Sequence, residues 1–396
     1  MIIDTLIKNG HVIDPGRGID GKFDIAIKNG RVVSVPEREQ VEATIVVDAT
    51  NKYVSPGWID YHSHTMPIGN MLAPISPSLA EIPNGVTATV DQGTAGVANY
   101  KIYLDVMKFS ILKFKANLNF ADIGMSGVGT IDGIYPTQIY NHETWDEKIE
   151  LWRTAFEENP SELLGMKFLF MNKVLFNGGV ERGIETLEKA VEICNKLEKK
   201  LTCHVAQCPV PIEEVTALLR EGDVLTHCFT GDYGHTILDE NGKLRPKIIE
   251  ARKSGVIMDT AEDIGNGCVP VDKAAIEQEF YPDCISTDLT QYTIYRTNRV
   301  LLGHAMAKYY DFGMPLNEVI RAVTETPAKV MEMYGSIGTL APGAYGDVTI
   351  FEKRDQSVEY TDKFGNREQG KTLFAPMCTI VNGSIAWRSI DFLVDE

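Results

Sequence analysis

The sequence lacks three features that mark secreted and membrane proteins. Its seven cysteines are an odd number and form no C-x-x-C pair, which indicates reduced thiols rather than a disulfide framework. No apolar run approaches the roughly 20 residues of a membrane-spanning helix. The opening stretch, MIIDTLIKNG, has no basic segment followed by an apolar core, which is the pattern of a signal peptide. We therefore expect a cytoplasmic protein without membrane association.

Positive charge is also scarce. The chain of 396 residues carries 38 Lys and Arg against 55 Asp and Glu, a formal net charge of -17 at pH 7. Such a surface repels phosphate backbones, so nucleic-acid binding is excluded as a function class. The hydrophobic share of 44% is that of an ordinary globular protein with a sizeable core. The expected partner is a small-molecule substrate.

Both ends of the chain are rich in predicted strands. Asn-Gly pairs stand between alternating apolar runs at 9–10, 29–30 and 382–383. Asn-Gly favours the type I′ turn of a two-residue hairpin, because both central residues there need positive φ. We therefore predict stacked hairpins at the two ends, which together form one small β-sandwich from residues 1–54 and 342–396.

The middle of the chain alternates strands with amphipathic helices. This pattern is typical of parallel strands joined by helical crossovers. With eight such strands, we predict an α/β fold in which residues 55–341 form a (β/α)8 TIM-like barrel. The predicted strands are 53–60, 87–92, 116–123, 164–170, 201–206, 224–229, 256–260 and 284–288.

Ionisable residues stand at the ends of several predicted strands. The segment PGWIDYHSH ends the first strand with His62 and His64, which face the same side because strand side chains alternate. The carboxyl ends of barrel strands meet at one edge, where catalytic groups gather. Later strands bring further candidates to that edge, namely Lys167, His204, His227 and Asp288.

Each candidate also has an ordinary interpretation. A single histidine on a strand is usually a hydrogen-bonded core or rim residue, and an Asp at a strand end often caps the next helix. Lys167 in LGMKFLF is harder to explain, since a buried ammonium costs several kcal/mol unless it is paired or chemically altered. The alternative is an exposed lysine on a misassigned strand, with Lys173 as the rival candidate.

Taken together, the candidates predict a metal site. Four neutral imidazoles and a carboxylate suit zinc, manganese or iron in the divalent state. Two ions fit if an anion bridges them, and a lysine whose amine has reacted with carbon dioxide becomes such an anion. A hydroxide held between two ions is a strong nucleophile at neutral pH.

The motif PGWIDYHSH resembles the P-G-x-I-D-x-H-x-H opening of the amidohydrolase superfamily. The order H-x-H, Lys, His, His, Asp on strands one, four, five, six and eight is similar to its binuclear branch, which includes dihydroorotases and hydantoinases. The segments 85–96, 211–231, 282–289 and 338–352 resemble the metallohydrolases of that branch named as deacetylases or dihydroorotases.

The resemblance implies a role for each residue. His62, His64 and Asp288 would bind the more buried ion, His204 and His227 would bind the other, and carboxylated Lys167 would bridge them. Asp288 would be the catalytic residue, which accepts a proton during attack and passes it to the leaving group. Zinc is the expected metal, with manganese and iron open. Relatives of this type imply a homo-oligomer, which no feature of the sequence itself indicates.

The resemblance is weaker at the rim of the barrel. The deacetylase-like group carries a histidine after the strand-six and strand-eight motifs and a D-V-G-H-G stretch after strand seven. Here these places hold Thr230, Thr290 and DTAED. Glu262 and Asp263 either make the rim acidic, which favours a neutral or cationic substrate, or cap the following helix. The expected substrate-binding residues are Thr230, Glu262, Thr290 and Tyr292.

The sequence favours a hydrolase that cleaves an amide, cyclic amide or ester bond, with a deacetylase-like activity first. A dihydroorotase- or hydantoinase-type cyclic amidohydrolase is the nearest alternative. A mononuclear deaminase is less favoured, because Gln207 stands where that branch carries a glutamate and because Lys167 is present. A non-catalytic scaffold relative is the last alternative, although such proteins typically lose metal ligands and this chain has all six.

Overall fold

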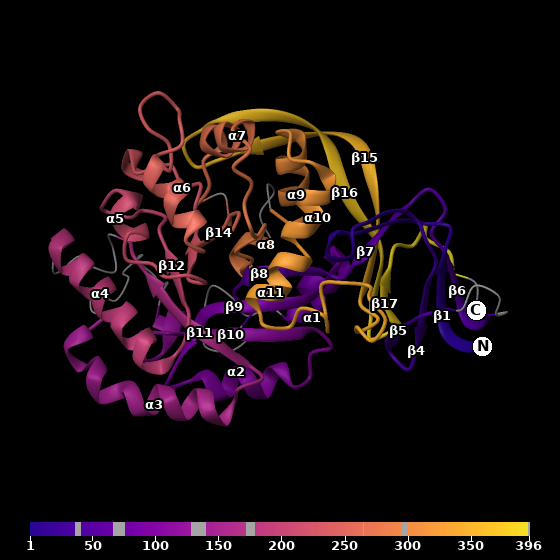
Figure 1. Cartoon of the computed structure of the whole chain (residues 1–396), viewed down its shortest axis with the longest axis horizontal. Helices are drawn as coiled ribbons and strands as arrows, with labels where there is room; N and C mark the ends of the chain where they lie inside the picture. The colour runs from indigo at the N-terminus through magenta and orange to yellow at the C-terminus, as the bar shows by residue number, and fades with distance from the viewer. Residues whose placement is uncertain are drawn as a thin grey trace.

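The structure is a computed structural model of the chain, and it describes residues 1–35, 41–65, 76–127, 140–171, 179–263, 265–294 and 300–394. A barrel surrounded by helices lies beside a smaller two-sheet unit that contains both ends of the chain (Figure 1). The predicted fold class, a TIM-like barrel with a composite β-sandwich, is confirmed.

The sandwich consists, within the described residues, of a sheet of four strands and a sheet of six. The first sheet has the order β5-β4-β1-β6, with β1 Ile2–Lys8, β4 Ile25–Lys28, β5 Arg31–Val33 and β6 Glu42–Asp48. The second has the order β17-β16-β15-β7-β2-β3, with β2 His11–Asp14, β3 Ile19–Lys22, β7 Tyr53–Pro56, β15 Val348–Thr361, β16 Arg367–Val381 and β17 Ser384–Arg388. Buried side chains from both sheets form one apolar core, which includes Ile7, Val12, Ile27, Val54, Val348 and Ile380.

Two of the three predicted hairpin turns are confirmed. Asn29 and Gly30 have φ of 51° and 73° between the antiparallel strands β4 and β5. Asn382 and Gly383 likewise have positive φ between the antiparallel strands β16 and β17. The prediction at 9–10 was wrong, because β1 and β2 lie in different sheets. Gly10 serves close packing there instead, since a Cβ would come within 2.5 Å of Val54 Cγ2.

The barrel sheet contains seven assigned parallel strands in the described part of the chain, in the order β14-β13-β12-β11-β10-β9-β8. The segment predicted as the eighth strand, 284–288, is bridged to β14 through Asp259–Cys284 and to β8 through Ser63–Leu289. It therefore closes the barrel without forming an assigned strand. The bounds are β8 Trp58–Ser63, β9 Val86–Gly96, β10 Lys113–Asn119, β11 Leu163–Leu169, β12 Leu201–His204, β13 Val224–Thr226 and β14 Ile257–Asp259.

The chain passes from sandwich to barrel at Gly57. The predicted first strand, 53–60, is two strands in the structure: β7 pairs within the sandwich and β8 begins the barrel. Glycine is required at the crossing, because a Cβ on Gly57 would lie 2.1 Å from Thr87 Oγ1. The predicted division at 54/55 and 341/342 stays a proposal, and the sandwich strand β7 extends past it to Pro56.

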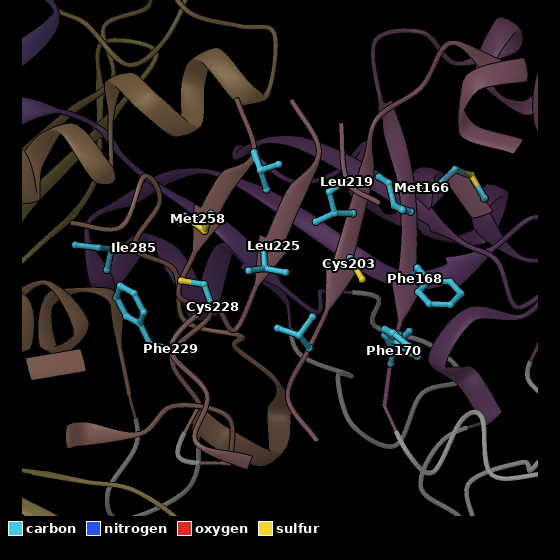
Figure 2. Packing of buried hydrophobic residues seen from close by; sticks show 14 of the residues in the cluster. Met166, Phe168, Phe170, Cys203, Leu219, Leu225, Cys228, Phe229, Met258 and Ile285 are labelled. Carbon is cyan, nitrogen blue, oxygen red and sulfur yellow. The ribbon is translucent and has the colours of Figure 1, made fainter. Parts of the chain in front are cut away.

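Alternation along the barrel strands separates apolar from polar side chains. Met166, Phe168 and Phe170 all belong to the large buried cluster in Figure 2, which also contains Cys203 and Cys228. Successive side chains on a strand point to opposite faces. Residues between these apolar positions, such as Lys167, therefore face the barrel interior, and the two thiols are packed away from it as predicted.

Helices cover the outside of the barrel (Figure 1). Amphipathic stretches predicted from the sequence form α3 Trp145–Glu158 and α4 Gly179–Leu197, which present apolar faces to the strands. The other helices are α1 Pro77–Glu81, α2 Tyr100–Met107, α5 Ile212–Thr216, α6 Pro246–Lys253, α7 Val269–Glu277, α8 Gln291–Ile294, α9 Leu302–Asp311, α10 Leu316–Ala322 and α11 Glu325–Val330. Among the described residues, none of the helices combines the length and apolar character needed to cross a membrane.

Candidate metal centre

The structure brings all six predicted ligand residues to the carboxyl edge of the barrel. His62 lies in β8, His64 just after it, Lys167 in β11, His204 at the end of β12, and His227 directly after β13. Asp288 lies in the bridged segment that closes the barrel. These side chains are largely withdrawn from solvent, and Lys167 is only 1% exposed. Lys173, the alternative lysine, lies outside the described residues.

The first half of the site joins strands one, four and eight. Asp288 Oδ1 lies 3.0 Å from His64 Nε2 and 3.5 Å from His62 Nε2, and Lys167 Nζ lies 3.3 Å from the same His62 nitrogen. Two ligands of one tetrahedral zinc ion, each about 2.0–2.1 Å from the metal, sit roughly 3.3 Å apart. These spacings are therefore compatible with groups that share an ion.

The second half joins strands five and six. The rings of His204 and His227 are adjacent, with centroids 4.3 Å apart, and His227 Nε2 lies 4.0 Å from Asp288 Oδ2. Asp288 thus turns one oxygen toward each half of the site. Ligand atoms of His62, His227 and Asp288 all lie within 4.8 Å of one another, as in a group that could hold a metal ion.

Hydrogen bonds determine which ring nitrogen of each histidine is available. His62 Nδ1 lies 3.2 Å from Asp259 Oδ2, and His227 Nδ1 lies 3.1 Å from the carbonyl oxygen of Ala261. A carboxylate or carbonyl oxygen only accepts, so each Nδ1 carries the hydrogen and each Nε2 keeps its lone pair. Nε2 of His227 is buried and has no hydrogen-bond partner among the described residues, which fits a nitrogen reserved for a metal.

His204 uses the opposite nitrogen. Its Nε2 donates to the carbonyl oxygen of Ala206 at 3.0 Å, which leaves the Nδ1 lone pair available. His64 Nδ1 lies 2.8 Å from Thr94 Oγ1, and Nε2 faces Asp288. His62, His204 and His227 therefore each bind the protein through one nitrogen and offer the other, which is the arrangement of metal-ligating imidazoles, while His64 contacts Thr94 through one nitrogen and Asp288 through the other.

Burial sets the protonation of the site. Burial, reinforced by the nearby Lys167 ammonium, lowers the pKa of His62 and His204 well below its usual value, and burial with the neighbouring His204 does the same for His227. Neutral imidazole is the form that binds metal. Burial also lowers the pKa of Lys167 to about 8, so roughly a tenth of its amine is uncharged at pH 7.

The backbone is strained where the strands end. Gln207, His227, Ala261 and Asp288 all have positive φ, at 60°, 62°, 45° and 54°. Such conformations cost about 1–3 kcal/mol each for a residue with a side chain and gather at functional sites. The positions follow strands five to eight, so the strain is concentrated around the proposed ligands.

Several residues that contact the ligands were not predicted, among them Asp259 and Asn266. Asp259 at the end of β14 accepts from His62 Nδ1 and from the Thr226 hydroxyl, and Asn266 Nδ2 donates to Asp288 Oδ2 at 2.7 Å. An Asp that ends a barrel strand was a visible signal for Asp259, while nothing in the sequence marked Asn266. Asp60 accepts from the backbone and hydroxyl of Thr287 and so links the first strand to the closing segment.

Two of the predicted substrate-binding residues contact neighbouring side chains of the protein. The Thr230 hydroxyl donates to Asp232 at 2.9 Å, and the Thr290 hydroxyl lies 3.2 Å from that of Thr293. The side chain of Tyr292, in α8, lies outside the described part of the chain.

Glu262 is not an open negative charge, and it does not cap a helix. Its carboxylate pairs with Lys308 at 2.5 Å and accepts from the Tyr309 hydroxyl, in a buried cluster that also contains Asp272. Glu262 and Lys308 also line a cavity of about 510 Å³ between α9 and the β15–β16 hairpin. The predicted acidic rim is therefore neutralised at Glu262.

Comparison with known proteins identifies the family. Residues 53–385 match the amidohydrolase family, so the chain belongs to that family. It is 28% identical to a deacetylase of Agrobacterium fabrum over 95% of this chain and 90% of that protein. It is 27% identical to a deacetylase of Enterococcus faecalis over 97% and 99%. The family is metal-dependent, and membership in it indicates a hydrolase that acts on carbon–nitrogen bonds.

Solved structures show the same architecture. A structure described as an adenine deaminase matches with a TM-score of 0.84 and 26% identity, over 98% of this chain and 100% of the other. A dihydroorotase structure matches with a TM-score of 0.82 and 26% identity, over 96% and 98%. The predicted relation to deacetylases and dihydroorotases is thus confirmed.

Proposed function

We propose that this protein is a binuclear metal-dependent hydrolase that cleaves an amide, cyclic amide or ester bond of a small molecule. The observation that carries the proposal is the convergence of four imidazoles, Asp288 and the buried Lys167 on one centre. The unpartnered Nε2 of His227 supports it, because a buried polar atom without a partner is costly unless something binds there. Zinc suits this set of nitrogen and oxygen donors best.

Lys167 supplies the bridging anion in this proposal. The neutral Nζ forms a bond to the carbon of carbon dioxide and loses one proton, which yields a carboxylated amine with two oxygens. The lowered pKa of Lys167, about 8, favours this reaction because only the uncharged amine has a free electron pair. The product also removes the cost of a buried ammonium.

The remaining residues divide between two ions. His62, His64 and Asp288 would hold one, and His204 and His227 would hold the other. When bound, the ions supply a hydroxide nucleophile and polarise the substrate carbonyl. Asp288 accepts a proton at its carboxylate and returns it to the leaving nitrogen or oxygen. Asn266 keeps that carboxylate oriented through its contact with Oδ2.

A deacetylase-like reaction is the first candidate, since the relatives from Agrobacterium fabrum and Enterococcus faecalis carry that name. The second is a cyclic amide hydrolysis, supported by the dihydroorotase structure at 26% identity. A deamination is the third, supported by the adenine deaminase structure at the same identity.

A screen on zinc-loaded protein separates these reactions. N-acetyl amino acids, O-acetyl hydroxy acids, dihydroorotate, hydantoins and adenine are each incubated with the enzyme and with Asp288→Asn. The proposal expects acetate release that the variant lacks. Ring opening without acetate release would shift the function to a cyclic amidohydrolase, and ammonia from adenine would shift it to a deaminase.

The surroundings of the enzyme are part of the same proposal. All seven cysteines are buried and free, which supports a reducing cytoplasmic compartment. The net charge of -17 opposes binding to nucleic acid or anionic membrane. A homo-oligomer is expected, and light scattering after size-exclusion chromatography tests it.

A further inference from the structure

One hairpin of the sandwich reaches the functional edge of the barrel. Strands β15 and β16 contain 14 and 15 residues, long enough to extend roughly 45 Å at about 3.3 Å per residue. In Figure 1 the pair leaves the sandwich, passes α9 and arrives beside α7. The turn that joins them, residues 362–366, therefore lies far from the rest of its own sheet.

The turn contacts segments that follow strands six and seven of the barrel. Asp362 Oδ2 accepts from the backbone nitrogen of Val269 at 2.9 Å, where α7 begins. Lys363 Nζ lies 2.6 Å and 2.7 Å from the two carboxylate oxygens of Asp232. Phe364 packs so close that a Cβ on Gly231 would lie 3.1 Å from its ring. Three neighbouring turn residues thus dock on one edge of the barrel.

Asp232 connects the turn to the loops behind the second half of the site. Its Oδ2 accepts from the backbone nitrogen of Gln207 and from the Thr230 hydroxyl, both at 2.9 Å. Gln207 stands three residues after His204, and Thr230 three residues after His227. One carboxylate therefore holds the loops that follow both histidines.

Lys363 is the cation that balances this carboxylate. The side chain of Asp232 is 10% exposed and that of Lys363 is 24% exposed, so the pair is largely shielded from solvent. Removing one partner of a shielded pair costs more than removing a surface charge, because the other charge is left without compensation. Loss of Lys363 would release the Asp232 carboxylate toward water and loosen both loops.

We propose that Lys363 is a positioning residue of the enzyme, which acts through Asp232 to hold His204 and His227 in place for the second metal ion. This inference rests on the proposed two-ion function. The β15–β16 hairpin then supports the metal ligands, although Lys363 lies 136 residues beyond His227 in the sequence.

Zinc binding tests the inference without any substrate. Zinc is titrated against a chromophoric chelator with wild-type protein, with Lys363→Met, which keeps the apolar stem and removes the charge, and with Lys363→Arg, which keeps the charge. Lys371→Met is the matched control, since it lies on the same hairpin and is exposed. Circular dichroism and thermal melting verify that each variant is folded.

Wild type is expected to bind two ions. Lys363→Met should bind one ion normally and the second about 10–100-fold more weakly, which is the usual loss when a group supporting a ligand is removed. Lys363→Arg should recover most of the loss, and Lys371→Met should match wild type. Asp232→Asn should reproduce the defect and serves as the second variant if Lys363→Met does not fold.

Normal binding of both ions by folded Lys363→Met or Asp232→Asn would overturn the inference, and so would equal weakening of both ions. Failure of the wild type itself to bind two ions would instead overturn the proposed function, so the two failures are distinguishable.

Discussion

The two halves of the metal centre are supported by different parts of the molecule. On the side of strands one and eight, His62 is held by Asp259 and Thr226, and His64 by Thr94. These partners are buried side chains of the barrel strands themselves. On the side of strands five and six, the histidines donate to backbone carbonyls in the loops after strands five and seven. The loops that follow the two histidines are tied to Asp232, which pairs with the distant hairpin.

This difference indicates how the ligand side chains of each half are held in position. Strand residues are fixed by the ladder of the barrel, so a neighbouring strand can supply the supporting side chain directly. Loop residues lack that ladder, and the loops after strands five and six need an external anchor. The sandwich provides the anchor, which gives the smaller unit a role in the chemistry of the larger one.

The largest expected effect comes from removing the residue between the two halves. Lys167→Ala should lower activity by about 10³-fold or more, since a hydroxide activated by two ions contributes more than the roughly 10²–10³-fold of a single stabilising donor. Steady-state kinetics with a substrate identified in the screen measures this loss. Lys173→Ala is the matched control and should be near wild type. A fully active Lys167→Ala with one tightly held ion would favour a mononuclear enzyme.

Asp259→Asn should weaken metal binding in the half of the site that the barrel strands support. The amide no longer accepts from His62 Nδ1 as a carboxylate does, so the ion bound by His62 and His64 should bind about 10–100-fold more weakly. The other ion should be retained, which is the reverse of the result for Lys363→Met. Zinc competition measures both, with the exposed Asp105→Asn as control. Loss of the same ion in both variants would contradict the division into two halves.

The pH dependence of zinc uptake should follow the protonation of Lys167. Carbon dioxide reacts only with the neutral amine, and the lysine pKa of about 8 is depressed from its usual value by burial. At a fixed concentration of dissolved carbon dioxide, the rate of zinc uptake by apo-protein should therefore rise about tenfold per pH unit up to pH 8 and level off above it. Stopped-flow fluorescence of a zinc indicator follows this rate. A rate independent of pH between 6 and 9 would count against carboxylation.

The smallest effect is expected for the thiols next to the ligands. Cys203 and Cys228 adjoin His204 and His227 in sequence but pack in the apolar cluster outside the barrel. Cys203→Ala should cost about 1 kcal/mol of unfolding free energy through a small cavity, with no change in zinc binding. Urea denaturation and the zinc titration check the two parts. A lost ion in this variant would place the thiol at the site instead.

Much of the barrel and of the ligand set could be predicted from the sequence. Strand alternation is a local property, so the pair His62 and His64 and the buried Lys167 could be assigned to the interior from their neighbours. Strand order then carries these residues to one edge. The prediction at Asn9-Gly10 failed because a turn motif does not reveal whether the two strands share a sheet.

The supporting residues could not be predicted in the same way. Glu262 was expected either at an acidic rim or as a helix cap, yet it pairs with Lys308, which lies 46 residues later in α9. Lys363 reaches Asp232 across 131 positions. Such contacts depend on where helices and hairpins dock after the barrel has formed, and no local pattern in the sequence encodes that docking.

A crystal structure of the zinc-loaded protein tests the central claim most directly. Anomalous difference density should show two ions, one beside His62, His64 and Asp288 and the other beside His204 and His227, with continuous density extending from Lys167 Nζ between them. A single ion beside an unmodified lysine would contradict the account.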